Sequence, residues 1–137
     1  MFANIAVPFD LAHAETQEKA VNAAADLAKQ YGSALTLVGV TSNTPSDVAH
    51  SPEEFLEKLT AYADAQSQKH GVTFNAYSTV SVDIAIDLEK KLNKAIHDIG
   101  ADLIVMASHA PGFRDYIFRS HSGNLATHTD LSVMIIR

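Results

Sequence analysis

Residues 101–109, ADLIVMASH, run from an almost wholly apolar segment directly into a serine and a histidine. Apart from Asp102, the segment ADLIVMA has the length and the hydrophobicity of a strand that is covered on both faces. Such strands are typical of parallel sheets, whose crossover helices lie on both sides. The polar residues that follow are therefore expected at the carboxyl edge of the sheet, where parallel α/β sheets bind ligands.

Outward from this stretch, strand and helix patterns alternate along the whole chain. Four further strands are predicted at residues 4–8, 34–40, 73–82 and 131–137, the third of them at a sheet edge because it is less apolar. Helical periodicity predicts helices at residues 16–31, 51–70 and 87–100, each closed by a glycine, and a short helix is expected at residues 120–127. This alternation predicts an α/β fold, a doubly wound five-stranded parallel sheet with helices on both faces, as a single domain over residues 1–137.

Composition excludes several classes of partner and site. The chain has 137 residues, 47% of them hydrophobic, and a formal net charge of -6, which disfavours binding to nucleic acid or to anionic membranes. It has no apolar run long enough for a bilayer span and no basic leader, so we expect a cytoplasmic protein. Without cysteine it has neither disulfides nor a thiolate site.

Three polar stretches follow predicted strands and should face one crevice: PFDLAH at residues 8–13, VTSN at residues 40–43 and SHAPG at residues 108–112. Asp10 is either a ligand contact or an acid that caps its own turn. Ser120 similarly serves as a helix N-cap, an anion contact or both.

Three motifs carry a resemblance to a known family: VPFD at residues 7–10, DLIVMASH at residues 102–109 and SVMIIR at residues 132–137. Over its whole length the chain resembles the universal stress proteins of the UspA type, and most of all a branch that reads A-S-H-x-P. The resemblance implies an adenine-nucleotide alpha-hydrolase-like fold with strand order 3-2-1-4-5. It also implies binding of ATP or another adenine nucleotide and a stress-response role.

The resemblance further implies which residues form the site. The backbone at Phe9 and Val40 would face the base, Asp10 would lie beside the ribose, and the loop after residue 107 would hold the phosphates. The complete expected set is Pro8, Phe9, Asp10, Val40, Ala107, Ser108, His109, Ala110, Arg119, Ser120, His121 and Ser122.

The chain departs from the family's phosphate motif at three glycine positions, which here are Ala107, Ala110 and Arg119. A Cβ atom hinders both positive φ and close approach of backbone N–H groups to phosphate. Arg119 either fills the pocket or replaces those donors with a guanidinium group, which suits phosphate oxygens. If the pocket is filled, Arg119 pairs with Asp10 or Asp115, and the protein is a nucleotide-free interaction module of the stress response.

The residues also bear on two other functions, metal binding and catalysis. His13, His109 and His121 with Asp10 offer possible metal ligands, but their spacing matches no metal motif, and we expect no metal beyond Mg²⁺ accompanying the nucleotide. We assign no catalytic residue, because the chain lacks a G-x-S-x-G elbow, a Walker lysine and a cysteine; slow ATP hydrolysis is the most that we expect. The remaining histidines are expected at the surface: His50, His70, His97 and His128.

The final strand, Leu131 to Arg137, leads us to expect a homodimer. Its sequence LSVMIIR is mostly apolar, and an open edge strand of this kind promotes aggregation unless it is covered. Pairing with the same strand of a second copy would cover it, as the resemblance also implies.

Overall fold

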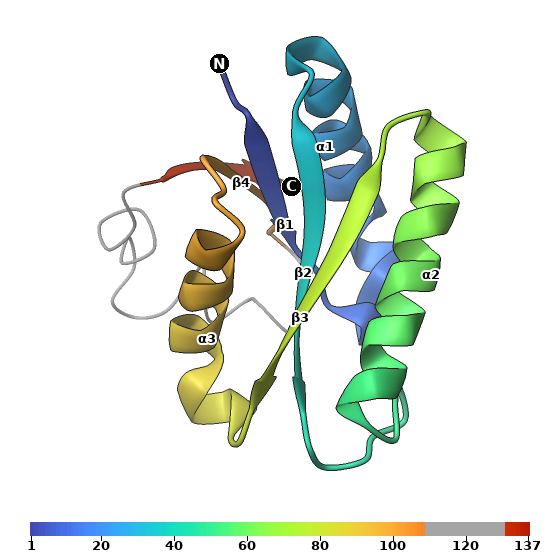
Figure 1. Cartoon of the computed structure of the whole chain (residues 1–137), viewed down its shortest axis with the longest axis vertical. Coiled ribbons are helices and arrows are strands. Elements are labelled where there is room, and N and C mark those ends of the chain that lie inside the picture. The colour runs from blue at the N-terminus through green and yellow to red at the C-terminus, as the bar shows by residue number, and fades with distance from the viewer. Residues whose placement is uncertain (109–130) are drawn as a thin grey trace.

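The computed structural model describes residues 1–108 and 131–137 and contains one five-stranded sheet of order β3-β2-β1-β4-β5 (Figure 1). Every strand pair in it is parallel. The strands are β1 (Asn4–Pro8), β2 (Ala34–Ser42), β3 (Phe74–Ser81), β4 (Leu103–Ala107) and β5 (Ser132–Ile136). The fold class and strand order expected from the sequence are confirmed, including the position of the third strand at an edge.

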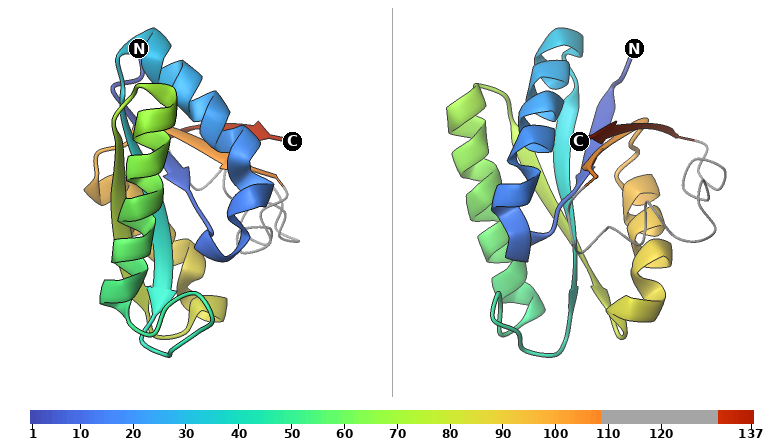
Figure 2. Two further views of the ribbon diagram at one scale, coloured as in Figure 1. Left: turned by 90° about the vertical axis from the view of Figure 1, so that its right-hand side faces the viewer. Right: turned by 180° about the vertical axis from the view of Figure 1, so that it is seen from behind.

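Helices cover both faces of this sheet (Figure 2). The described helices are the 3-10 segment η1 (Leu11–Gln17), α1 (Glu18–Tyr31), α2 (Pro52–His70) and α3 (Ile84–Asp98). Residues such as Ile5, Val7 and Leu37 pack with α1 and α2 in one buried cluster. Their strand neighbours Ala6 and Val38 pack with α3 in the other, as the twofold alternation of side chains along a strand requires.

Helix boundaries follow local chemistry where the sequence carries a capping signal. Ser51 accepts a hydrogen bond at Oγ from the Glu54 N–H and caps α2, whose first residue is a proline. Gly32 and Gly71 adopt the left-handed conformation that ends α1 and α2. Both predicted helix ends are confirmed.

Other boundaries differ from the prediction. The first helical segment begins as 3-10 turns at Leu11 and becomes α-helical only at Glu18, two residues after the predicted start. The third helix was expected from Asp87 but begins at Ile84; the Asp87 N–H already donates to the Asp83 carbonyl, 2.8 Å away. The second strand continues two residues beyond Val40. The predicted helix at residues 120–127 lies outside the described residues.

Gly39 allows α2 to lie close to the sheet. A Cβ atom added at this position would be 2.7 Å from Cε1 of the Phe55 ring, which is itself buried. Glycine within a strand often marks such a close approach. Among the described residues, no helix has the length and apolar character needed to cross a membrane.

Candidate functional site at the carboxyl edge of the sheet

The carboxyl ends of β1 and β2 are uneven, and this leaves backbone groups of β2 uncovered. β1 ends at Pro8, opposite Val38, whereas β2 continues to Ser42. The Val38 carbonyl accepts a hydrogen bond of 2.9 Å from the Phe9 N–H, so the backbone groups of Val38 face β1. Residues two apart on a strand direct these groups to the same side. The N–H and C=O of Val40 therefore point into the space beyond the end of β1.

Asp10 lies at the first βα turn and caps it. Its carboxylate accepts a hydrogen bond from the Ala12 N–H at 3.1 Å, and its other oxygen is 2.8 Å from Nδ1 of His13. The side chain of Asp10 is 17% exposed and that of His13 is 45% exposed. The capping role foreseen for Asp10 is thus present. Because the carboxylate is also partly exposed at the sheet edge, this role leaves room for a ligand contact.

Gln17 holds the same turn from inside and was missed in the sequence. Only 1% of it is exposed. Its Oε1 accepts from the Asp10 N–H at 2.8 Å, while Nε2 donates to the carbonyls of Asp10 and His13 at 2.7 and 2.8 Å. The side-chain amide therefore bonds three backbone groups of the turn. Two of these groups have a second partner, because the Asp10 carbonyl also accepts from the His13 N–H at 3.1 Å and the His13 carbonyl from Oγ1 of Thr16 at 2.8 Å.

Phe9 fixes the position at which the chain enters this turn. Its ring is buried and stacks on Tyr62 of α2, with 4.6 Å between ring centroids and an interplanar angle of 29°. Its N–H completes the ladder with Val38. The preceding Pro8, which has no N–H, ends β1.

Ser108 extends the pairing of β4 with β5 by one backbone hydrogen bond. Its N–H donates to the Ile136 carbonyl at 2.9 Å, and 4% of the residue is exposed. The Oγ atom has no hydrogen-bond partner within residues 1–108 and 131–137. A buried hydroxyl without a partner is costly, so it is a candidate group for an external ligand. The methyl group of the neighbouring Ala107 is buried in a core cluster.

A hollow lies beside the turn, between the first helical segments and α2. Its volume is about 330 Å³, and it is lined by Ala14, Glu15, Glu18, Tyr62 and Gln66. Burial raises the pKa of the Tyr62 hydroxyl, and the nearby Glu18 carboxylate adds to that rise.

The structure brings together, at the ends of β1, β2 and β4, six of the predicted site residues: Pro8, Phe9, Asp10, Val40, Ala107 and Ser108. The other six lie outside the described residues: His109, Ala110, Arg119, Ser120, His121 and Ser122. Of the four possible metal ligands, only Asp10 and His13 are described. Within the part of the chain that the structure covers, no three His, Cys, Asp or Glu side chains gather as a metal site.

Comparison with known proteins supports the resemblance seen in the sequence. The model of the universal stress protein family matches residues 1–137. The chain is also 21% identical over 143 residues to universal stress protein G of Escherichia coli O157:H7, and the match covers 100% of both proteins.

Solved structures with the same fold include ligand complexes. A universal stress family protein from Burkholderia pseudomallei has a TM-score of 0.67 at 24% identity, covering 98% of this chain and 95% of that one. A universal stress protein in complex with cAMP has a TM-score of 0.66 at 16% identity, covering 99% and 97%. The Archaeoglobus fulgidus protein in complex with dAMP has a TM-score of 0.64 at 17% identity, covering 98% of each chain.

Proposed function

This chain belongs to the universal stress protein family, and from that premise we propose that it binds an adenine nucleotide at the carboxyl edge of its sheet. One observation carries the proposal. The Asp10 turn, the uncovered backbone of Val40 and the hydroxyl of Ser108, which has no partner among the described residues, lie where β1, β2 and β4 end. Two solved proteins of the same fold are complexes with cAMP and dAMP.

Each group has a chemical role in this proposal. The backbone N–H and C=O of Val40, with the backbone that follows Pro8 and Phe9, offer the donor and acceptor that an adenine edge requires. The Asp10 carboxylate accepts hydrogen bonds from ribose hydroxyls, and Gln17 holds it in place. The Ser108 hydroxyl begins the phosphate side.

We assign the remaining phosphate contacts to the loop after Ala107 and Ser108. They come from His109, Ala110, Arg119, Ser120, His121 and Ser122. Arg119 supplies a guanidinium group where the family has glycine, so charged N–H donors replace close backbone donors. Mg²⁺ enters with the nucleotide as its usual counter-ion.

Titration calorimetry with ATP and with AMP, each with and without Mg²⁺, tests the proposal. We expect saturable heat at up to about millimolar nucleotide, which corresponds to roughly 4 kcal/mol of binding energy. Asp10→Asn should weaken both ligands, because a neutral amide accepts more weakly from the ribose hydroxyls. The exposed Asp26 on α1 provides the matched control, Asp26→Asn, which should bind normally. Absence of heat and of any thermal shift at millimolar nucleotide would exclude the proposal.

A variant at position 119 separates this function from its alternative. If the guanidinium group binds phosphate, Arg119→Gly weakens ATP binding more than AMP binding, because AMP has fewer phosphate oxygens. If Arg119 instead fills the crevice and pairs with a protein carboxylate, the same change creates or improves ATP binding. The protein would then be a nucleotide-free interaction module.

We also propose that two copies pair through β5. This strand is at the end of the sheet, and Met134 and Ile135 are 37% and 43% exposed. Pairing would cover an edge that carries no charged residue between Ser132 and Ile136. A monomeric mass in light scattering, or a dimer unaffected by Met134→Lys, would argue against this interface.

Three further assignments belong to the same proposal. We assign the chain to the family branch with the A-S-H-x-P sequence, which here is Ala107, Ser108, His109 and Pro111. We propose that residues 1–137 form one domain. We also propose a cytoplasmic protein of the stress response, as membership of the universal stress protein family suggests.

A further inference from the structure

The outer edge of β3 presents unpaired backbone groups. Asn75 lies on the side of β2, where its side chain donates to the Leu35 carbonyl at 3.3 Å. Phe74 faces the other way, and its N–H donates to Ser67 of α2 at 2.8 Å instead of to β2. Alternation along the strand then directs the N–H and C=O of Ala76, Ser78 and Val80 to the outer edge. Among the described strands, none pairs with β3 on that side.

The sequence of β3 has none of the usual protection of an exposed edge. FNAYSTVS contains no charged residue and no proline over its length. Natural edge strands are commonly blocked by lysine, by proline or by a bulge. Val80, at 36% exposure, and Val82, at 88%, add exposed apolar surface at the end of this strand.

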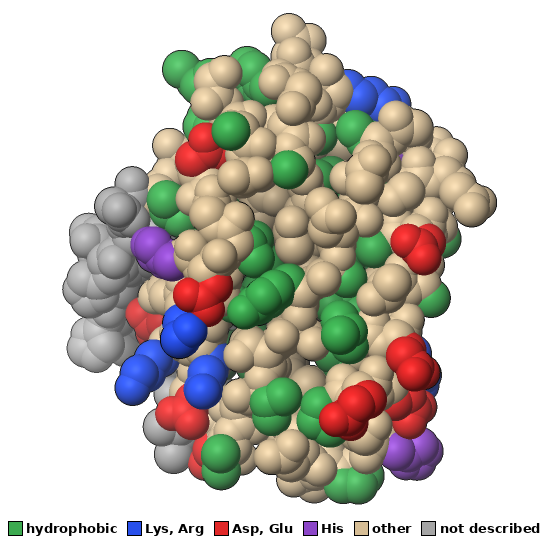
Figure 3. Space-filling view, in the orientation of Figure 1, with side chains coloured by type: hydrophobic (Ala, Val, Ile, Leu, Met, Phe, Trp, Pro, Cys, Tyr) green, Lys and Arg blue, Asp and Glu red, His purple; other side chains and the backbone are tan. Residues whose placement is uncertain are grey.

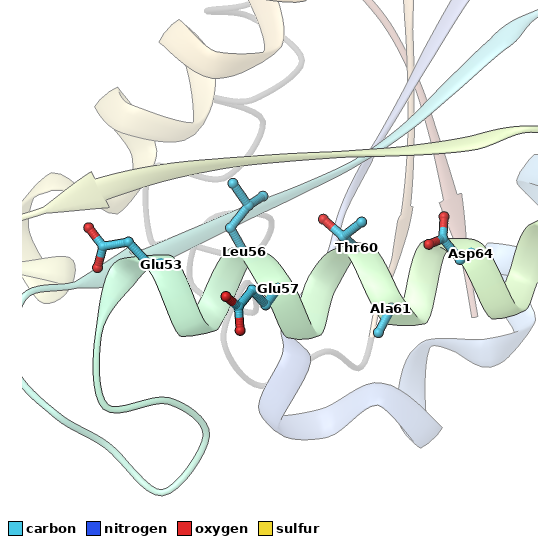
Figure 4. A pocket seen from close by; sticks show the side chains of 6 residues that line it. All are labelled: Glu53, Leu56, Glu57, Thr60, Ala61 and Asp64. Carbon is cyan, nitrogen blue, oxygen red and sulfur yellow. The ribbon is translucent and has the colours of Figure 1, made fainter.

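A groove on α2 runs beside this edge. It has a volume of about 550 Å³ and is lined by Glu53, Leu56, Glu57, Thr60, Ala61 and Asp64, which form one stripe of the helix. Figure 4 shows Leu56, Thr60 and Asp64 pointing toward β3. Leu56 is 39% exposed, so the floor of the groove is apolar while its rim carries carboxylates.

Charge distinguishes the two sides of the edge. Acidic side chains gather over the lower part of α2, and lysine side chains lie over α3, with hydrophobic side chains between them (Figure 3). On the α3 side, Lys94 is paired with Asp98 at 2.7 Å. The groove carboxylates Glu53, Glu57 and Asp64 have no ion pair with another described residue. On the α2 side of β3, these three carboxylates therefore carry negative charge that no described ion pair balances.

We propose that the β3 edge binds an extended basic segment of a partner protein, which adds to the sheet as a further strand. Backbone groups of Ala76, Ser78 and Val80 would supply the hydrogen bonds. Alternate lysine or arginine side chains of the partner would lie over the α2 groove, with their aliphatic stems on Leu56 and their charges at Glu53 and Asp64. The intervening side chains would face Tyr77, which packs on the α3 side.

A second copy of this chain fits the same edge less well. Antiparallel pairing of two β3 strands about a twofold axis would place α2 beside α2 and bring the two acidic stripes together. Each chain also carries a formal net charge of -6. A basic segment removes that repulsion and adds attraction, so charge complementarity selects it.

The test uses four heptapeptides and the full-length protein. The first alternates lysine with valine, and the second has glutamate in place of lysine. The other two are isomers of the first that are N-methylated at all lysines or at all valines. An extended peptide directs one set of N–H groups to each of its edges, so pairing with β3 uses only one set. Fluorescence anisotropy should show binding of the first peptide and of one methylated isomer, and no binding of the other isomer or of the glutamate peptide.

Protein variants locate the binding site. The Glu53→Lys, Asp64→Lys double variant should weaken binding of the lysine peptide about tenfold, since two attractions become repulsions. Asp26→Lys with Asp47→Lys, at two exposed acids that do not line the groove, makes the same change in net charge and should have a much smaller effect. Ser78→Pro removes one outward N–H without removing a bond to β2, and should abolish most binding.

The outcomes are distinct. Equal binding of both methylated isomers would show attraction by charge alone and overturn the proposal. Equal loss of peptide binding in the two double variants would also overturn it. A third contrary outcome is self-association in light scattering that Ser78→Pro abolishes, because it would show that a second copy occupies the β3 edge. If Ser78→Pro is misfolded by circular dichroism, the isomeric peptides on the unmodified protein still decide the question.

Discussion

The side-chain amide of Gln17 bonds the backbone of Asp10 on both sides, accepting from its N–H at 2.8 Å and donating to its carbonyl at 2.7 Å. Asp10 precedes the 3-10 segment η1, and Gln17 at the end of that segment holds its backbone in place. The carboxylate proposed to meet the ribose depends on a buried residue that would touch no ligand.

Replacing Gln17 with leucine should lower both stability and nucleotide affinity. Leucine has similar volume but removes the bond to the buried Asp10 N–H and one of the two bonds to each of the Asp10 and His13 carbonyls, at a cost of about 2 kcal/mol in the free energy of unfolding. Urea denaturation measures this cost, and calorimetry with AMP measures the affinity. The control is Gln30→Leu, at an exposed position of α1, which should change neither. Unchanged stability in Gln17→Leu would show that the amide is dispensable.

Gly39→Ala should destabilise the protein by about 1 to 3 kcal/mol, the range for overpacking a core. The added methyl group would lie 2.7 Å from the Phe55 ring, and the ring is too buried to move away freely. Chemical denaturation of the variant gives the cost directly. The double variant Gly39→Ala, Phe55→Leu should lose less stability than the sum of the two single variants, because the smaller leucine side chain leaves space for the added methyl group. Purely additive effects would contradict a direct contact.

Patterns in the sequence predicted the sheet better than the turns. Residues 103–107 are continuously apolar, and together with the alternation of strand and helix patterns this predicted a buried parallel strand, which β4 is. The start of α3 was missed because the valine and isoleucine residues of VDIAID are β-prone, whereas backbone bonding begins the helix at Ile84. Gln17 was missed because a glutamine at a helix start normally faces water. Only the 3-10 turn, which no periodicity reveals, brings its amide to the Asp10 backbone.

His70 predicts a dependence of stability on mildly acidic pH. It was expected at the surface, but it is half-buried, with its ring 5.9 Å from that of Phe74. Burial, and then the charges of Lys69 and Lys29, lower the pKa of His70 below its ordinary 6.5. The unfolded chain therefore binds this proton more readily than the folded protein. The contribution of neutral His70 is complete above pH 6.5 and is lost progressively as the pH falls below that value.

The measurement is the free energy of unfolding from pH 7.5 to pH 5, a range set by the ordinary histidine pKa of about 6.5. His70→Gln has no such titration. The difference in stability between the unmodified protein and His70→Gln should shift in favour of the variant as the pH is lowered through this range. A difference that stays constant would show that the folded environment of His70 does not disfavour its charged form.

Ser108→Ala separates a ligand role from a structural one. The Ser108 hydroxyl is buried and has no hydrogen-bond partner among the described residues, so its removal should leave the free energy of unfolding unchanged or slightly higher. If the hydroxyl donates to a phosphate, the same change should weaken AMP binding about fivefold, the loss of one hydrogen bond of about 1 kcal/mol. Thermal denaturation without nucleotide and calorimetry with AMP report the two effects separately. A variant that binds AMP normally but unfolds more easily would place the hydroxyl in the fold and remove it from the site.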